Sequence, residues 1–329
     1  MPLKKPLIWA VLLVIVLGFV VVTSMELLQI TNPRKLEIAV ILKTTHIRSD
    51  YWQMVSSGVK EAAKEYTVNI NITGPLTETD TAAQIRMVDE ALLKKPDAIV
   101  LAATDDEGLS TSVAKIKKSG TKLILIDSPV QGTAAEASLI ATDNTEAGRK
   151  AGEFLAGGYN EQVSRIISLS GSQASRAEKE RQNGFQEKLA AISSVAYEGN
   201  FALEGNVDAA YEQVKNLLTV YPNLQGIAAL NETATLGAAR AIKENQRGKS
   251  IQLIGFDSSV HQIKLLEEGI LQAIIVQKPF NIGYLAVETA VQASTGIKVN
   301  PKVSISAQLI TRENMYTQEN QELLFPLVE

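Results

Sequence analysis

The sequence predicts an α/β protein in which helices cover both faces of mainly parallel sheets. Alanine, isoleucine, leucine and valine dominate a composition that is 45% hydrophobic and only 5% aromatic. The apolar runs are short and rich in β-branched residues, as in parallel strands that are buried on both faces. Helical patterns separate these runs along the chain, which is typical of βαβ units rather than of a β-sandwich.

The first half of the chain alternates strands and helices from residue 36 onward. Strands are expected over 36–42, 68–73, 98–102, 123–127 and 137–142, and helices over 51–66, 80–94 and 109–118. The second half repeats this order at similar length. Its strands are expected over 165–170, 195–200, 226–230, 251–256 and 271–276, and its helices over 145–155, 177–192, 207–220, 233–244 and 260–268.

The repetition favours two doubly wound lobes over one sheet of ten or more strands. A last helix over 282–295 and a last strand over 302–309 would be an odd addition to the second lobe alone. We therefore expect both of them to return to the first lobe.

The opening of the chain predicts a membrane anchor. Lys4 and Lys5 are followed by sixteen uncharged residues, 7–22, and the stretch 6–25 reaches the roughly 20 residues that a spanning helix needs. Two lysines ahead of the span keep the N-terminus in the cytoplasm. Residues 1–36 are thus expected to be an anchor and linker, and everything after them extracytoplasmic.

A cleaved signal peptide is the alternative, and it would leave a secreted protein. Its apolar core would be long, and Val22-Thr23-Ser24 is only a tolerable cleavage site. The chain has no cysteine, which excludes a lipoprotein anchor. Both readings put the remaining chain outside the cytoplasm.

Composition and motifs exclude several function classes. The net charge is −4 and no basic run follows the first lysines, so no nucleic-acid partner is expected. His46 and His261 are isolated, so no metal-ligand cluster is expected either. The chain has no dinucleotide-binding glycine motif, no nucleophile elbow and no phosphate-binding loop. We expect neither a cofactor nor an enzyme.

Ligands of doubly wound sheets bind beyond the carboxyl ends of the strands, so the polar residues there are the candidates. They are 49–52, Thr104-Asp105 and Asp127-Ser128 in the first half, and 171–175, Asn231-Glu232, Asp257-Ser258 and Gln277 in the second. Structural roles compete with binding: either aspartate could only cap a turn or helix, and Tyr51-Trp52 could be a hydrophobic staple.

Five segments together resemble the type I periplasmic binding proteins of the ribose, galactose and xylose class. They are LIATDNTEAGRKAGEFLA (139–156), GSQASRAEKERQNGFQEKL (171–189), LNETATLGAARAI (230–242), LIGFDSS (253–259) and IIVQKPFNIGYLAVE (274–288). The resemblance covers about 37–311. It implies two lobes joined by three crossing strands, near 142–144, 277–278 and 306–307, that close on a ligand by hinge motion.

The lobes implied by the resemblance are 37–142 plus 278–306, and 143–277 plus 307–329. The expected ligand is a monosaccharide or similar polyol. Aromatic rings would cover the faces of its ring, and carboxylates, amides and an arginine would bind the hydroxyls on its edge. The ligand residues implied are Tyr51, Trp52, Asp105, Asp127, Ser128, Thr142, Arg181, Asn231, Asp257 and Gln277. Arg181 could instead be a surface partner of Glu178, three residues earlier.

The chain departs from the resemblance at two places. Sugar binders of this class commonly carry an arginine directly after the aspartate at Asp127, where this chain has Ser128-Pro129. The aromatic residue expected near Phe201 is not clearly placed. These departures leave the identity of the sugar open, and leave room for a different polyol or a signalling molecule.

Two functions follow from the resemblance. In the first, the protein delivers its ligand to the membrane permease of an ABC-type importer. In the second, it is a membrane-anchored sensing subunit that signals to a histidine kinase or receptor. An uncleaved helix without a lipid-modified cysteine favours sensing, whereas delivery is the commoner use of this fold.

Overall fold

The computed structural model describes residues 13–19, 34–46, 50–132, 138–158, 164–171, 175–203, 206–248 and 250–325. The chain divides into two units, residues 1–36 and 37–329. In the first unit, residues 13–19 are helical. None of the described helices combines the length and the apolar character needed to cross a membrane. Most of the predicted anchor, residues 1–29, lies outside the described residues.

The second unit contains two six-stranded sheets. The first sheet has the order β11-β5-β4-β3-β1-β2, and all of its pairings are parallel. Its strands are β1 (Glu37–Ile41), β2 (Asn69–Thr73), β3 (Ala98–Leu101), β4 (Lys122–Ile126), β5 (Ser138–Thr142) and β11 (Lys302–Ile305). The apolar runs predicted as buried strands therefore form adjacent strands of one sheet.

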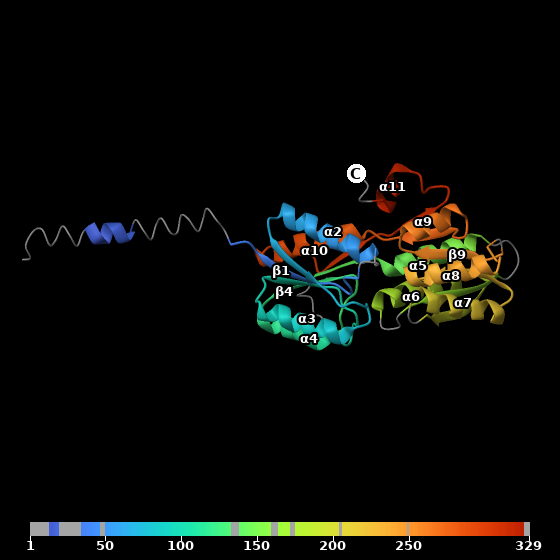
Figure 1. Ribbon diagram of the computed structural model, residues 1–329, viewed down its shortest axis with the longest axis horizontal. Helices are drawn as coiled ribbons and strands as arrows, with labels where there is room; N and C mark the ends of the chain where they lie inside the picture. The colour runs from blue at the N-terminus through green and yellow to red at the C-terminus, as the bar shows by residue number, and fades with distance from the viewer. Residues whose placement is uncertain are drawn as a thin grey trace, which may run out of the picture. The chain divides into compact units, whose positions relative to one another are not determined.

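Helices cover both faces of the first sheet. Ile38 and Val40 of β1 pack with α2 (Asp50–Glu65) and α10 (Pro279–Ser294). Ala39 and Ile41 point the other way and pack with α3 (Thr81–Leu93) and α4 (Ser110–Ser119). Figure 1 shows α2 and α10 on one side of this sheet and α3 and α4 on the other. We call the sheet with these four helices the first lobe.

The second sheet has the order β12-β10-β9-β8-β6-β7. Its strands are β6 (Ser164–Ser170), β7 (Val195–Ala202), β8 (Leu224–Ala229), β9 (Gln252–Phe256), β10 (Ala273–Val276) and β12 (Gln308–Thr311). Only the edge strand β12 pairs antiparallel, with β10. The prediction of two doubly wound, mainly parallel lobes is confirmed.

Helices also sandwich the second sheet, and together with it they form the second lobe. One face packs with α5 (Asn144–Gly157) and α6 (Arg176–Ala190). The other packs with α7 (Val207–Val220), α8 (Glu232–Glu244) and α9 (Val260–Glu267). The short helix α11 (Gln318–Leu324), which the sequence pattern did not predict, buries Leu324 in that second core.

Glycines in each lobe let two helices touch along their backbones. A Cβ on Gly283 of α10 would lie 2.1 Å from the carbonyl oxygen of Val55 in α2. A Cβ on Gly148 of α5 would lie 1.9 Å from the carbonyl oxygen of Arg181 in α6. Since real Cβ atoms essentially never come so close to another atom, only glycine fits at these positions.

The predicted strand over 302–309 is wrong as one element. It divides into β11, which pairs with β5 in the first sheet, and β12, which pairs with β10 in the second. Ser306 and Ala307 lie between the two strands and let the chain pass from one sheet to the other. The chain also changes lobe twice more. After β5 it passes to α5 in the second lobe, and after β10 it returns to the first lobe, where α10 packs on α2.

Candidate ligand-binding site

Asp127 follows β4 and forms a buried ion pair with Lys43, which follows β1. The Lys43 Nζ lies 2.5 Å from Asp127 Oδ2, and the two side chains are only 7% and 8% exposed. Lys43 also donates to Ser128 Oγ at 3.2 Å, and Ser128 Oγ donates to Asp127 Oδ2 at 2.9 Å. Burial alone would raise the pKa of Asp127, but Lys43, Arg181 and Ser128 outweigh it and lower that pKa. Asp127 is therefore an ionised acceptor.

Tyr51, at the start of α2, faces the same carboxylate. Its hydroxyl donates to Asp127 Oδ1 at 3.4 Å. Burial, and then the charges of Asp127 and Asp257, raise the pKa of Tyr51 well above its usual value, so it remains a neutral phenol. Trp52 meets the Tyr51 ring edge-on at 4.9 Å, but it is 3% exposed and packs into the core of the first lobe. Its indole N–H donates to Glu78 at 2.9 Å.

In the second lobe, Asp257 follows β9 and is held by Gln277, which follows β10. Gln277 Nε2 donates to Asp257 Oδ1 at 2.5 Å. Thr142, at the end of β5 in the first lobe, donates from Oγ1 to Gln277 Oε1 at 2.8 Å. Because Gln277 bonds to residues of both lobes, it links the two strand ends at a point where the chain crosses between them.

Arg181 of α6 is 4% exposed and is fixed on three sides. Its Nε donates to Asn144 Oδ1 at 2.9 Å, and its Nη1 donates to the carbonyl of Leu230 at 2.7 Å. Its guanidinium lies 4.7 Å from the centre of the Phe256 ring. Burial acts to raise the pKa of both Asp127 and Asp257, and the charge of Arg181 opposes that rise in each, so it acts on both sides of the junction.

Asn231 is both a helix cap and a neighbour of a buried carboxylate. Its Oδ1 accepts from the backbone N–H of Ala234 at 2.7 Å and caps α8. Its side chain also hydrogen-bonds Glu178, which accepts from the backbone N–H of Gly171 at 2.5 Å. Burial raises the pKa of Glu178, although these hydrogen bonds and Arg181 partly offset the effect.

Glu232 is the first residue of α8 and lies beside Asp257 at this junction. Burial raises its pKa to about 7, in spite of a hydrogen bond from Ser259 that lowers it. The negative charges of Asp257 and of Asp50 in the first lobe raise it further. Glu232 is therefore partly protonated near neutral pH.

Burial also raises the pKa of Asp257, while Arg181 and Gln277 act against that rise. The two aspartates thus differ: Asp127 is stabilised as an anion and Asp257 is held closer to neutrality. Neutral side chains and two cations, Lys43 and Arg181, surround the aspartates and donate hydrogen bonds, whereas the carboxylates accept them. Such a set suits vicinal hydroxyls, each of which donates and accepts.

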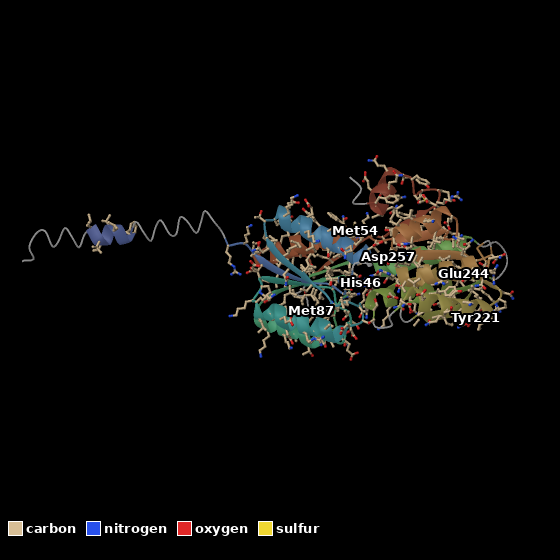
Figure 2. The ribbon with its side chains drawn as sticks, viewed as in Figure 1. His46, Met54, Met87, Tyr221, Glu244 and Asp257 are labelled. Carbon is tan, nitrogen blue, oxygen red and sulfur yellow. The ribbon has the colours of Figure 1, made fainter. Side chains whose placement is uncertain are left out.

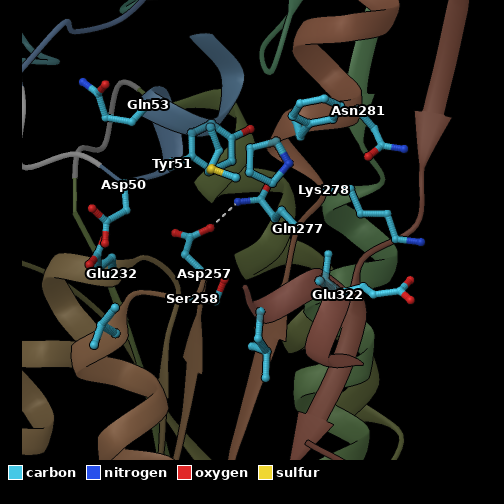
Figure 3. A pocket seen from close by; sticks show the side chains of 16 residues that line it. Asp50, Tyr51, Gln53, Glu232, Asp257, Ser258, Gln277, Lys278, Asn281 and Glu322 are labelled. Carbon is cyan, nitrogen blue, oxygen red and sulfur yellow. Dashed lines mark hydrogen bonds between the residues drawn. The ribbon is translucent and has the colours of Figure 1, made fainter. Parts of the chain in front are cut away.

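A pocket of about 420 Å³ opens beside these residues. Figure 3 shows Tyr51 above Asp257 and Gln277, with the Gln277–Asp257 hydrogen bond drawn as a dashed line. The residues that line the pocket come from both lobes: Asp50, Tyr51, Gln53, Met54, Glu232, Asp257, Ser258, Val260, Gln277, Lys278, Pro279, Phe280, Asn281, Glu322, Leu323 and Leu324. Figure 2 shows Asp257 and Met54 near the junction of the lobes, with Glu244 and Tyr221 far from it.

The structure places six of the predicted residues in two hydrogen-bonded groups, and the charge of Arg181 acts on the aspartate of each; we call these groups and their charged neighbours the polar network. Tyr51, Asp127 and Ser128 are joined by hydrogen bonds, and so are Thr142, Gln277 and Asp257. Asp105 instead accepts from the backbone N–H groups of Glu107 and Gly108, as in a local turn. No hydrogen bond among the described residues joins Asp105 to the others. Whether any of these residues contacts a ligand stays a prediction.

Three charged residues of the network were not among the predicted ligand residues. Lys43 comes directly after a predicted strand end, and its position was the only available signal. Glu178 lies in the segment 171–189 that carries part of the resemblance, and Glu232 directly follows Asn231 at a predicted strand end. Among the described residues, no group of three or more His, Cys, Asp or Glu side chains is arranged to hold a metal ion.

Residues 38–298 match the family described as a periplasmic binding protein domain. The chain is 26% identical over 312 residues to the ribose import binding protein RbsB of Bacillus subtilis, covering 92% of this chain and 98% of that protein.

Two solved structures are also similar. A carbohydrate transporter solute-binding protein from Agrobacterium radiobacter, in complex with D-arabinose, has a TM-score of 0.84 and 28% identity, covering 89% of this chain and all of that one. A sugar transporter from Clostridium phytofermentans has a TM-score of 0.75 and 34% identity, covering 85% of this chain and all of the other.

Proposed function

This chain belongs to the periplasmic binding protein domain family, and from that premise we propose that it captures a small sugar between its two lobes and delivers it to an ABC-type importer. The family is one of binding proteins and not of enzymes. Its members work outside the cytoplasm. The relatives support a sugar as the ligand, since one is named for ribose import and another was solved with D-arabinose.

The observation that carries the proposal is that each lobe places a buried aspartate and a nearby cation at the junction. Asp127 with Lys43 comes from the first lobe, and Asp257 with Arg181 from the second. Thr142 and Gln277 join the lobes between them. A hydroxyl-rich ring bound by both aspartates would hold the lobes together, so ligand binding would favour the closed form.

The proposed contacts use the full predicted set. Tyr51 offers a ring face, and Trp52 supports it from the core. The proposed hydrogen-bonding residues are Asp105, Asp127, Ser128, Thr142, Arg181, Asn231, Asp257 and Gln277. We add Lys43 to this set, because it supplies beside Asp127 and Ser128 the cation that sugar binders of this class commonly carry as an arginine.

The lobes of the proposed closure are residues 37–142 plus 278–306, and 143–277 plus 307–329. Residues 1–36 would tether them to the outer face of the cell membrane as an uncleaved anchor. Determining the N-terminal residue of the protein in isolated membranes tests the anchor. A mature product that begins near Met25 would contradict it.

A sensing role is the second candidate. An apolar N-terminal segment without a cysteine favours a fixed position beside a membrane histidine kinase, because delivery gains from a mobile carrier. In that case the closed form would dock on the kinase instead of on a permease. Co-purification from membranes with either a permease or a kinase distinguishes the two roles.

A thermal-shift panel of pentoses, hexoses and polyols tests the binding itself. A ligand at a hundred times its dissociation constant adds about 2.7 kcal/mol to the free energy of unfolding, and so raises the midpoint by several degrees. We expect a clear rise with at least one neutral sugar. A flat response to every sugar would contradict the proposal.

A further inference from the structure

The pocket of Figure 3 extends beyond the residues proposed to hold a single sugar. Of its lining, Tyr51, Glu232, Asp257 and Gln277 belong to the polar network described above. Asp127, Lys43 and Arg181 do not line it. The pocket therefore borders the part of the polar network around Asp257 and Gln277. It does not reach the part around Asp127 and Lys43.

The outer part of this pocket differs in chemistry from the inner network. Met54 of α2, Phe280 of α10 and Leu324 of α11 are among six apolar residues there, which also include Pro279, Val260 and Leu323. The Phe280 ring stacks on the Tyr284 ring, with 6.5 Å between the ring centres. Polar groups, including Gln53, Lys278 and Asn281, lie around these apolar residues. We call this part the outer subsite.

An apolar lining with polar groups around it suits a ring whose faces are apolar and whose edge is polar. The volume, about 420 Å³, lies within the roughly 300–1,000 Å³ that ligand pockets usually have. Charge does not favour an anion here, because Asp50, Glu232, Asp257 and Glu322 all line the pocket and Lys278 is its only cationic lining residue.

We propose that the outer subsite binds a second ring attached to the sugar, so that the chain accepts a neutral glycoside and not only a free monosaccharide. This inference rests on the proposed function, since the sugar itself would occupy the polar network. The second ring would lie between Met54 and Phe280 of the first lobe and Val260 of the second. Because it touches both lobes, it would add to the closure that the sugar promotes.

Titration calorimetry on the full chain, in a detergent without a sugar headgroup, tests the inference. The probes are D-ribose, D-allose, D-arabinose and D-fucose, each beside its phenyl α- and β-glycosides and a disaccharide that contains it. The phenyl and disaccharide arms separate an aromatic ring from a second sugar as the occupant. We expect at least one conjugate to bind about tenfold tighter than its free sugar.

Val260→Trp isolates the outer subsite. Val260 is 70% exposed at the start of α9, so a larger side chain there can fill the subsite without entering the core. The preferred conjugate should then lose about tenfold in affinity, while the free sugar stays within about twofold. Val220→Trp is the matched control, because Val220 is 67% exposed at the end of α7 and does not line the pocket. It should change neither affinity.

Free-sugar binding with no conjugate bound more tightly would overturn the outer subsite and leave the proposed function standing. Equal losses for sugar and conjugate in Val260→Trp would overturn it as well. Binding of neither sugars nor conjugates would overturn both proposals.

Discussion

Asp127 and Asp257 hold the same position in the two lobes. Each follows a strand inside its sheet and has a left-handed backbone, with φ of 67° and 72°. Each donates its backbone N–H to the neighbouring strand, to Ile140 at 3.0 Å and to Ile275 at 2.9 Å. Aspartate tolerates this conformation better than most residues, so both strands can turn sharply and direct a carboxylate to the junction.

Asp257→Asn should abolish most ligand binding without unfolding the protein. Asparagine also tolerates the left-handed backbone, while it replaces a charged acceptor by a neutral one. We expect a loss of about 1.5–3 kcal/mol in binding free energy and a nearly unchanged thermal midpoint for the free protein. Asp257→Ala should in addition lose about 1–2 kcal/mol of stability, because alanine disfavours that conformation. An unfolded Asn variant would indicate a purely structural role.

Lys43→Met should destabilise the protein, because it leaves Asp127 buried without its cation. The expected loss in the free energy of unfolding is about 3–5 kcal/mol, measured by urea denaturation. The pKa of Asp127 should rise, since the largest influence that lowers it would be gone. Adding Asp127→Asn should recover most of the stability.

Lys115→Met is the matched control for Lys43. Lys115 pairs with Asp89 at 2.7 Å, but both side chains are nearly half exposed. An exposed pair contributes only about 0–1 kcal/mol. Equal losses for the two lysine variants would show that burial of the Lys43–Asp127 pair has no energetic consequence.

Glu232 should make stability fall as the pH rises toward neutrality. Its pKa is about 7 in the folded state against 4.5 for an ordinary glutamate, so the folded protein holds the extra proton between these values. The free energy of unfolding therefore decreases across that window, by at most about 3 kcal/mol. Glu232→Gln should flatten the slope in urea titrations at several pH values. Glu322→Gln, an exposed lining residue of the same pocket, should leave the slope unchanged.

Gly148→Ala should separate α5 from α6 and displace Arg181. The new Cβ would meet the Arg181 carbonyl oxygen, so we expect a loss of about 1–3 kcal/mol in stability and weaker ligand binding. Gly157→Ala, in the same helix, has open space around the new Cβ. It should be neutral or stabilising by about 0.5–1 kcal/mol. Similar losses in both variants would argue against a special role for the contact.

Much of the fold follows from local patterns. Buried strands such as 98–101 are continuous apolar runs, and each is followed by a helix with its own apolar face. The split at Ser306-Ala307 could not be read in this way, because the residues on both sides alternate like one strand. Only the pairing partners, β5 and β10, distinguish the two pieces.

The candidate site was predictable where a residue's role depends on its place at a strand end, as for Asp127, Asp257 and Gln277. The role of Lys43 was not predictable, because a lysine after a strand is usually solvated. The burial of Lys43 depends on the strand order, in which β3 lies between β1 and β4. Asp105 differs from Asp127 in using its carboxylate on its own turn. That choice depends on loop geometry, which residue type alone does not determine.

Capture of a sugar between the lobes is tested most directly by titration calorimetry on three proteins: the wild type, Asp127→Asn and Asp257→Asn. The probe is the neutral sugar that gives the largest thermal shift. We predict that the wild type binds and that each variant, one in either lobe, weakens binding about tenfold or more. Unchanged affinity in either variant would mean that one lobe alone holds the ligand, which contradicts capture by closure.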